Sequence, residues 1–227
     1  MRVSAIHAIA AGCTLLLAAP VASSQTVVLD FEEVACPPPG TGSGGYTISG
    51  NYTFGGYSIA TTAVASTATV GQAVWCSGPN FAGSQAWFVN HVFSSTSRLS
   101  RPDGGWFGIE SISLGTVVPS PAAAGPITFT GTLMQGGTVT QTFNVPHTPT
   151  ATLSPFQFDG GFVNLSALEW TTGSTGTQGP NPDLANVQID NLVLTRTVPE
   201  PGTTVLVMIG FVCLLGGRRL RATAAGH

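Results

Sequence analysis

Two neighbouring segments of this 227-residue chain alternate apolar and polar side chains with a period of two. The first reads ITFTGTL from Ile127 to Leu133, and the second reads VTQTFNV from Val139 to Val145. Successive side chains of a β-strand point to opposite faces, so each segment would place its apolar residues on one face and its threonines on the other. Gly136 and Gly137 between them favour a tight turn. The pattern predicts an antiparallel hairpin with one buried and one polar face.

Short segments of the same kind recur between Gln25 and Thr197, and no amphipathic helix pattern interrupts them. Asp103-Gly104-Gly105 predicts a second turn, and Phe107 after it fits the alternation only with a bulge or twist. The predicted strands cover 26–32, 52–60, 68–75, 86–92, 97–101, 106–114, 127–133, 139–145, 151–158, 162–170 and 186–195. Loops are predicted at 37–45, 78–83, 118–125 and 173–183. We therefore predict an all-β fold, an antiparallel two-sheet sandwich of the jelly-roll-like type.

The N-terminus has the order of a cleavable signal peptide. Arg2 gives a positive start, residues 3–21 are mostly apolar, and Ala22-Ser23-Ser24 offers small residues for signal peptidase. A lipid anchor on Cys13 is the alternative, but the apolar run continues past that cysteine. We expect a signal peptide helix at 1–24 and a mature chain that begins at Gln25.

The C-terminus combines three elements in a fixed order. Pro199, Glu200 and Pro201 precede an uncharged apolar segment at 203–217, and Arg218, Arg219 and Arg221 follow it. A helix of this length is slightly short for a bilayer, and snorkelling arginines could cover the difference. Because arginine is retained on the cytoplasmic side, residues 222–227 would form a cytoplasmic tail and the rest of the chain would face outward. A plain single-pass anchor would show the same apolar helix.

This C-terminal arrangement resembles the PEP-CTERM sorting signal of exported bacterial proteins, over residues 198–221. The resemblance implies that exosortase, an integral-membrane transpeptidase, removes the tail, so that the transmembrane helix is temporary. It also implies an inner-membrane intermediate in a Gram-negative bacterium, followed by the cell surface or extracellular matrix, and an association with exopolysaccharide and biofilm. Residues 25–197 would then be the exported β-sandwich ectodomain.

Charge and cysteines are distributed unevenly along the chain. All ten acidic residues follow position 24, and nine of them lie within residues 25–197, where the only basic residues are Arg98, Arg101 and Arg196, so this region has a net charge of about −6. Such a surface disfavours nucleic-acid binding, which needs a basic face. Of the four cysteines, only Cys36 and Cys76 would remain after export, and an oxidising compartment predicts that they form a disulfide.

The two ends of the ectodomain suggest a metal site. The segments 27–32 and 187–194 resemble the first and last strands of jelly-roll carbohydrate-binding modules, in which neighbouring terminal strands hold a structural calcium. Carried over, the resemblance implies Asp30, Glu32 and Asp190 as ligands, and their carboxylates suit calcium. The alternative is that Asp190 caps or bends the strand through a hydrogen bond to the backbone. Calcium is the one cofactor that the sequence suggests.

The chain lacks the common catalytic motifs, and outside the two signals its histidines are His91 and His147 alone. Glycoside hydrolysis would need two carboxylates across a cleft, for which the candidates are Asp103, Glu110, Asp159 and Glu169. We therefore predict a protein without catalytic residues.

Aromatic side chains give a further hypothesis. The glycine-rich stretch that holds Tyr46, Tyr52 and Tyr57 is the candidate for an exposed sugar-stacking patch, whereas Trp106 and Trp170 are predicted to lie in the core. The favoured function is a non-catalytic surface or matrix protein, and the alternative is a lectin-like carbohydrate-binding module, ahead of a glycoside hydrolase. A lectin should show an aromatic-lined groove with convergent polar groups. The expected partners are signal peptidase, exosortase and extracellular polysaccharide.

Overall fold

The structure is a computed structural model, and it describes residues 23–38, 44–63, 71–90, 95–172 and 185–198. The chain divides into the unit Ser24–Thr197 and a second unit that holds both termini. The predicted signal peptide helix and transmembrane helix lie outside the described residues. Within the described ranges, no helix has the length and apolar character needed to cross a membrane.

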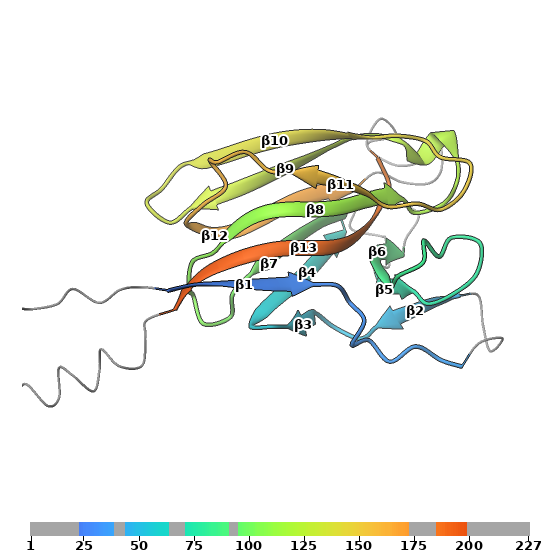
Figure 1. The fold of residues 1–227 in the computed structure, drawn as a ribbon, viewed down its shortest axis with the longest axis horizontal. Coiled ribbons are helices and arrows are strands. Elements are labelled where there is room, and N and C mark those ends of the chain that lie inside the picture. Colours follow the sequence, from blue (N-terminus) through green and yellow to red (C-terminus); the bar gives the residue numbers. More distant parts are fainter. Residues whose placement is uncertain (1–22, 39–43, 64–70, 91–94, 173–184, 199–227) are drawn as a thin grey trace, which may run out of the picture. The chain divides into compact units, whose positions relative to one another are not determined.

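The described residues form antiparallel strands that build a two-sheet sandwich (Figure 1). The elements are β1 Ser23–Leu29, β2 Gly45–Ile48, β3 Tyr52–Phe54, β4 Tyr57–Ala63, β5 Gly71–Trp75, β6 Ala86–Asn90, β7 Ser95–Ser100, β8 Gly108–Thr116, η1 Pro121–Ala123, β9 Gly125–Leu133, β10 Thr138–Val145, β11 Ser154–Gln157, β12 Leu165–Thr172 and β13 Val187–Val198. One sheet has the order β11-β8-β13-β6-β5-β2, with β1 also paired to β13, and the other has the order β10-β9-β12-β7-β4-β3. The predicted all-β, jelly-roll-like sandwich is confirmed.

The predicted hairpin is β9 and β10. The two strands pair in antiparallel register, with Thr138 opposite Thr132 and Val145 opposite Gly125. Gly136 and Gly137 in the turn have φ angles of 92° and 87°, a region that side chains other than glycine rarely adopt. The two glycines therefore determine where the chain reverses between β9 and β10.

The core fills the space between the two sheets with large apolar side chains. Trp87 of β6 meets Trp170 of β12 edge to face, with ring centroids 5.7 Å apart, so this pair joins one sheet to the other. Phe129 of β9 packs against the same Trp170 ring at 5.7 Å. Gln72 of β5 adds a buried polar link, since its Nε2 donates to the Ile59 carbonyl of β4 at 2.9 Å.

The structure divides one predicted strand and adds another. The segment expected at 52–60 is two strands, β3 and β4, because Gly55 and Gly56 reverse the chain with positive φ angles. β2 lies at the end of a predicted loop, where Gly45 to Ile48 pairs with β5. Phe107 stays outside β8 and pairs with Leu165 in an isolated bridge, which is the irregularity that its phase predicted.

The terminal strands lie side by side. β13 pairs with β6 only at Gln188 and Ile189, and β1 also pairs with β13 (Figure 1). The Arg196 guanidinium near the end of β13 donates to the Gln25 side chain near the start of β1, at 2.9 and 2.7 Å. Gln25, the expected first residue of the mature chain, is therefore hydrogen-bonded to β13, the strand that precedes the sorting signal.

Candidate functional site

A row of threonines crosses the outer face of the second sheet. Thr142 of β10 lies opposite Thr128 of β9, Thr171 of β12 lies opposite Thr96 of β7, and Thr96 lies opposite Thr62 of β4. Phe129 pairs with Trp170, so Thr128 and Thr171, the next residues in register, are also neighbours. The row therefore runs over five adjacent strands, about 4.8 Å apart.

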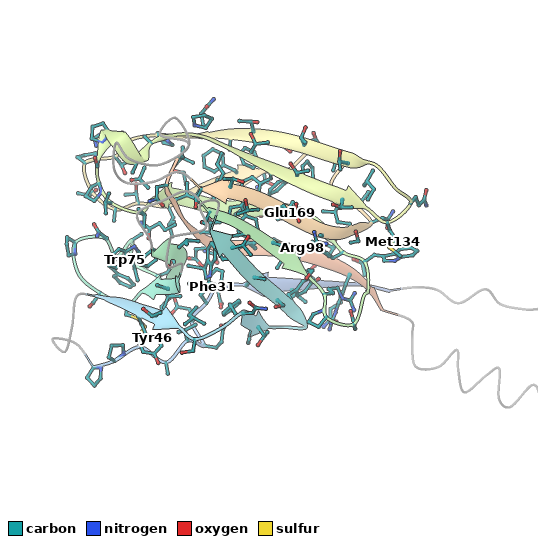
Figure 2. The ribbon with its side chains drawn as sticks, turned by 180° about the vertical axis from the view of Figure 1, so that it is seen from behind. Phe31, Tyr46, Trp75, Arg98, Met134 and Glu169 are labelled. Carbon is teal, nitrogen blue, oxygen red and sulfur yellow. A yellow bond between two sulfur atoms is a disulfide. The ribbon has the colours of Figure 1, made fainter. Side chains whose placement is uncertain are left out.

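The hydroxyl groups of this row interact with one another. Thr128 and Thr142 share a hydrogen bond of 2.7 Å, and Thr96 and Thr171 share one of 3.0 Å. Beside the row, Arg98 forms an ion pair with Glu169 of the next strand (Figure 2). Both charged side chains are about half exposed, so this pair adds little stability. It places two charged groups beside the neutral threonine hydroxyl groups of the face.

A shallow hollow of about 240 Å³ lies over the centre of the row. Its lining residues are Thr96, Thr128, Thr130, Glu169, Trp170 and Thr171. The Trp170 side chain is only 2% exposed and packs in the core, so the hollow offers threonine hydroxyl groups and the Glu169 carboxylate rather than an aromatic platform. Such a surface can make many weak hydrogen bonds to a polyol, without strong selection of one molecule.

The sequence contained the signal for half of this row. The alternation in 127–133 and 139–145 predicted threonines on one face of the hairpin, which the structure shows. The other half needed the pairing of β9 with β12 and of β12 with β7, which joins residues far apart in the chain. A strand order cannot be derived from local alternation.

The structure corrects the predicted aromatic patch. Tyr52 and Tyr57 are 4% and 1% exposed, whereas Tyr46 is 40% exposed. The Tyr52 hydroxyl donates to the Glu33 carboxylate, and burial followed by this contact raises the pKa of the phenol. Tyr57 packs edge to face on Phe107 at 5.5 Å. Tyr52 of β3 and Tyr57 of β4 face the core, so of these three tyrosines only Tyr46 could stack on a ligand.

Of the two tryptophans predicted to lie in the core, the structure buries one and exposes the other. Trp170 is buried as predicted, but Trp106 is 49% exposed. Trp106 precedes β8. The isolated bridge between Phe107 and Leu165 places the Phe107 side chain in the core, so Trp106, one residue earlier, faces solvent. Local alternation did not reveal this because the phase changes between the turn and the strand.

Asp190 is a buried carboxylate at a bend of β13. Its Oδ2 accepts from the Ser84 hydroxyl at 2.5 Å, and its Oδ1 accepts from the Asn191 backbone N–H at 2.7 Å. The register against β8 shifts between Asp190 and Val193, and Asn191 has a φ angle of 48°. The alternative role, bending the strand through a side chain to backbone hydrogen bond, is the one seen.

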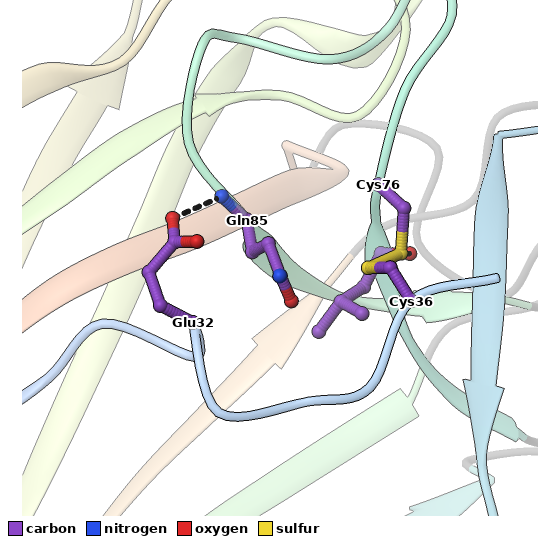
Figure 3. Close-up of a disulfide and its surroundings, with 5 residues drawn as sticks. Glu32, Cys36, Cys76 and Gln85 are labelled. Atoms are coloured by element: carbon purple, nitrogen blue, oxygen red, sulfur yellow. Dashed lines mark hydrogen bonds between the residues drawn. A yellow bond between two sulfur atoms is a disulfide. The ribbon is translucent and has the colours of Figure 1, made fainter. Parts of the chain in front are cut away.

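The two other proposed calcium ligands lie on the chain that follows β1. Glu32 is exposed and accepts from the Gln85 backbone N–H at 2.8 Å (Figure 3). Asp30 accepts from the Glu32 N–H at 3.4 Å. Among the described residues, no three His, Cys, Asp or Glu side chains gather closely enough to hold a metal ion. As placed, these carboxylates do not fit a calcium ion, so we derive no role for calcium, and its binding stays a prediction.

Asp190 predicts a pH dependence of stability. Burial raises its pKa to about 6, against the lowering effect of the Ser84 and Asn191 hydrogen bonds. Because this pKa lies above that of an unfolded aspartate, about 4, the group stabilises the fold fully below pH 4 and loses this contribution as the pH rises through 6. We expect a loss of about 1–2 kcal/mol between pH 4 and 7.5 from this group.

Urea unfolding of the wild type and of Asp190→Asn at both pH values measures the effect. The difference in unfolding free energy between the two proteins should shift toward the variant as the pH rises, and a difference that is independent of pH would contradict the assignment. Thermal unfolding of the same two proteins, with calcium or with a chelator, tests the calcium hypothesis. A calcium-dependent rise in Tm that Asp190→Asn abolishes would support it.

The candidate hydrolytic carboxylates are held in separate contacts. Asp103 binds Arg101 at 2.6 Å, Glu169 pairs with Arg98, and Asp159 accepts the N–H of Gly161 at 2.9 Å. Hydrogen bonds from Gly105 and Arg101 lower the pKa of Asp103. Glu110 and His147 are exposed on the described surface, and His91 lies outside the described residues. The hollow over the threonine row is lined by a single carboxylate, that of Glu169, so it holds no facing pair.

Cys36 and Cys76 form the predicted disulfide, with Cα atoms 5.8 Å apart (Figure 3). The bridge joins the segment after β1 to the end of β5, and both residues pack on the core. It therefore holds the chain that carries Glu32 and Glu33 against the rest of the sandwich.

Comparisons with known proteins identify the C-terminal signal. Residues 197–221 match the PEP-CTERM protein-sorting motif, so this chain carries that motif. No curated protein matches the sequence.

Solved structures give only distant likenesses. The chain is 14% identical to the enzymatically active domain of tailspike protein 4 from bacteriophage CBA120, with a TM-score of 0.34, over 63% of this chain and 20% of that one. It is 10% identical to a family 11 carbohydrate-binding module of Clostridium thermocellum in complex with a β-1,3-1,4-mixed-linked tetrasaccharide, with a TM-score of 0.37, over 70% of this chain and 100% of that one. The same module family from a cellulosomal cellulase of that organism matches at 10% identity, with a TM-score of 0.36, over 70% and 98%. Likenesses of this degree carry no argument about function.

Proposed function

We propose that this chain is the precursor of an exported surface or matrix protein, processed by signal peptidase and exosortase. The sorting motif at 197–221 carries this proposal. It begins at the last two residues of β13, so the folded domain ends where the sorting motif begins. The inner-membrane intermediate and the final place at the surface of a Gram-negative cell follow from this route.

The ectodomain, residues 25–197, serves this route as a non-catalytic β-sandwich. Its broad polar face offers hydroxyl groups and one exposed ion pair, and the described residues show no aromatic-lined groove over that face. A matrix component needs many weak contacts with neighbouring polymers rather than one deep site. The threonine row suits contact with exopolysaccharide, since each hydroxyl can both donate and accept.

The test removes the signal and follows the protein. Pro199→Ala with Glu200→Ala and Pro201→Ala, or deletion of 198–227, should abolish processing and prevent arrival at the surface. Cell fractionation and the mass of the exported form measure this outcome. Deletion of 222–227 is the matched control, because it shortens the tail but keeps the motif and its arginines. Wild-type processing of the triple variant would refute the proposal.

A second candidate function is specific carbohydrate binding at the hollow over the threonine row. The observation in its favour is the continuous row of hydroxyl groups across five strands. A glycan array with the mature protein, compared with Thr128→Ala and Thr171→Ala, tests it. Thr138→Ala, on the same face but outside the hollow, is the matched control. Selective binding lost only in the first two variants would favour this candidate over a general matrix role.

A further inference from the structure

Exposed apolar side chains gather at one end of the sandwich. Of the six large hydrophobic residues exposed among the described ones, four lie at a strand end, on a turn or in a loop there: Phe54, Trp106, Met134 and Val163. They come from the end of β3, the segment before β8, the β9–β10 turn and the loop before β12. β1 begins and β13 ends at this same end (Figure 1).

Contacts between these segments show that they share one surface. Trp106, Val163 and Asn164 line a hollow of about 170 Å³ together with Arg196 of β13. The Met134 N–H donates to the Asn164 carbonyl at 2.9 Å, which places the β9–β10 turn beside that hollow. A Cβ on Gly56 of the β3–β4 turn would lie 3.1 Å from Arg196. We call this surface, formed by 54–56, 102–107, 134–137 and 160–164, the terminal end.

Trp106 is held in its exposed position by a hydrogen-bonded turn. Arg101 donates to the Trp106 carbonyl at 3.0 Å and to the Asp103 carboxylate at 2.6 Å, and the Asp103 side chain accepts the Gly105 N–H at 2.9 Å. The backbone that carries the exposed indole is therefore ordered before any partner binds, so little backbone conformational entropy is lost when a partner covers Trp106. Tryptophan at the edge of an apolar patch is typical of contact with a membrane interface.

The charge of the terminal end differs from that of the rest of the domain. Two of the three arginines in residues 25–197, Arg101 and Arg196, lie at this end, and Arg196 binds the neutral Gln25 side chain. Asp103 and Asp159 balance them, so the terminal end is close to neutral in a strongly acidic domain. An anionic bilayer repels the rest of the surface more than this end.

The length of chain beyond β13 brings this end to the membrane. β13 ends at Val198 and the apolar segment begins at 203, so the connection reaches at most about 18 Å. A domain of this size has a radius of gyration near 16 Å. While the tail is inserted, the end of the sandwich from which β13 leaves must stay near the lipid headgroups.

From this we infer that the terminal end is a membrane-contact surface that seats the precursor on the bilayer, with Trp106, Val163 and Met134 at the headgroup level. The inference rests on the proposed function, because it requires the tail to be inserted before exosortase acts. Contact at this end fixes the orientation of the domain and keeps the Pro-Glu-Pro segment at the membrane surface, where an integral-membrane transpeptidase works. Release of the tail removes the tether, and the patch then loses its membrane contact.

The test uses the precursor that retains its tail, reconstituted in vesicles of phosphatidylethanolamine and phosphatidylglycerol with brominated phosphatidylcholine, which quenches tryptophan on contact. Flotation first reports insertion of the tail. Trp87 and Trp170 are buried, and Trp75 lies at the opposite end from Met134 (Figure 2), so quenching reports Trp106. We expect bromine to remove the emission that Trp106 contributes, measured as the difference between the wild type and Trp106→Phe, and to leave Trp106→Phe unquenched.

Hydrogen exchange on the same vesicles gives an independent reading. The terminal end should exchange more slowly in the inserted precursor than in the protein without its tail. Met134→Ser with Val163→Ser should reduce both the quenching and this protection, whereas Tyr46→Ser, which alters an exposed aromatic residue on β2, should leave them unchanged. Flotation without quenching or protection would overturn the inference and leave the sorting proposal intact.

Two other outcomes also decide the matter. Failure of the wild-type precursor to float would overturn the inserted intermediate and this inference together. Protection of the terminal end by soluble exopolysaccharide, in the absence of vesicles, would overturn it in favour of a glycan site around Trp106.

Discussion

Loss of the Cys36–Cys76 disulfide is expected to lower the free energy of unfolding by about 4 kcal/mol. The bridge closes a loop of sequence separation 40 and so restricts the unfolded chain. In the folded protein it also holds the segment after β1, where Glu32 accepts from Gln85 and Glu33 accepts from Tyr52. Urea unfolding of the exported protein with and without reductant measures the change, and mass spectrometry under non-reducing conditions measures the bond.

The double variant Cys36→Ala with Cys76→Ala separates the bond from side effects of the reductant. Reductant should have no further effect on its stability, and hydrogen exchange should speed up first in residues 30–38. Cys213→Ala in the precursor is the matched control, because that cysteine lies in the tail and has no expected role in the folded domain. Free thiols at Cys36 and Cys76 in exported protein would contradict the prediction.

The strands could be predicted where one face of the sheet is buried and the other is solvated. β9 and β10 show this clearly, since Phe129 and Phe143 face the core while Thr128 and Thr142 face outward. β2 escaped prediction because its exposed and half-buried residues give no clear alternation. The division at Gly55 and Gly56 was missed because the two glycines lie inside a longer apolar pattern that resembles one strand.

The sequence predicted the C-terminal sorting motif and the disulfide better than the surfaces. Pro199, Glu200 and Pro201 belong to a short motif whose order is local, and export leaves one way to pair two cysteines. The threonine row and the terminal end depend on which strands become neighbours. Residues such as Thr96 and Thr171, or Trp106 and Val163, meet only through long-range pairing. Neither surface could be derived from local patterns.

Replacement of Trp170 by alanine is expected to cost about 3–5 kcal/mol of unfolding free energy. The indole is 2% exposed and belongs to β12, which lies between β9 and β7 in the second sheet. It touches Trp87 from the other sheet and Phe129 from its own, each with ring centroids 5.7 Å apart. Alanine would leave a cavity where the two sheets meet, and the surrounding rings could fill it only in part.

Trp106→Ala is the matched control, because it deletes the same side chain at a site that is 49% exposed. It should change the unfolding free energy by no more than about 0.5 kcal/mol, as is usual for surface substitutions. Trp170→Phe should fall between the two variants, since it retains a ring in the core and removes an indole N–H that has no hydrogen-bond partner among the described residues. Urea unfolding followed by circular dichroism compares all three without relying on tryptophan emission. Equal costs for Trp170→Ala and Trp106→Ala would show that the packing of the two sheets does not depend on the Trp87–Trp170 contact.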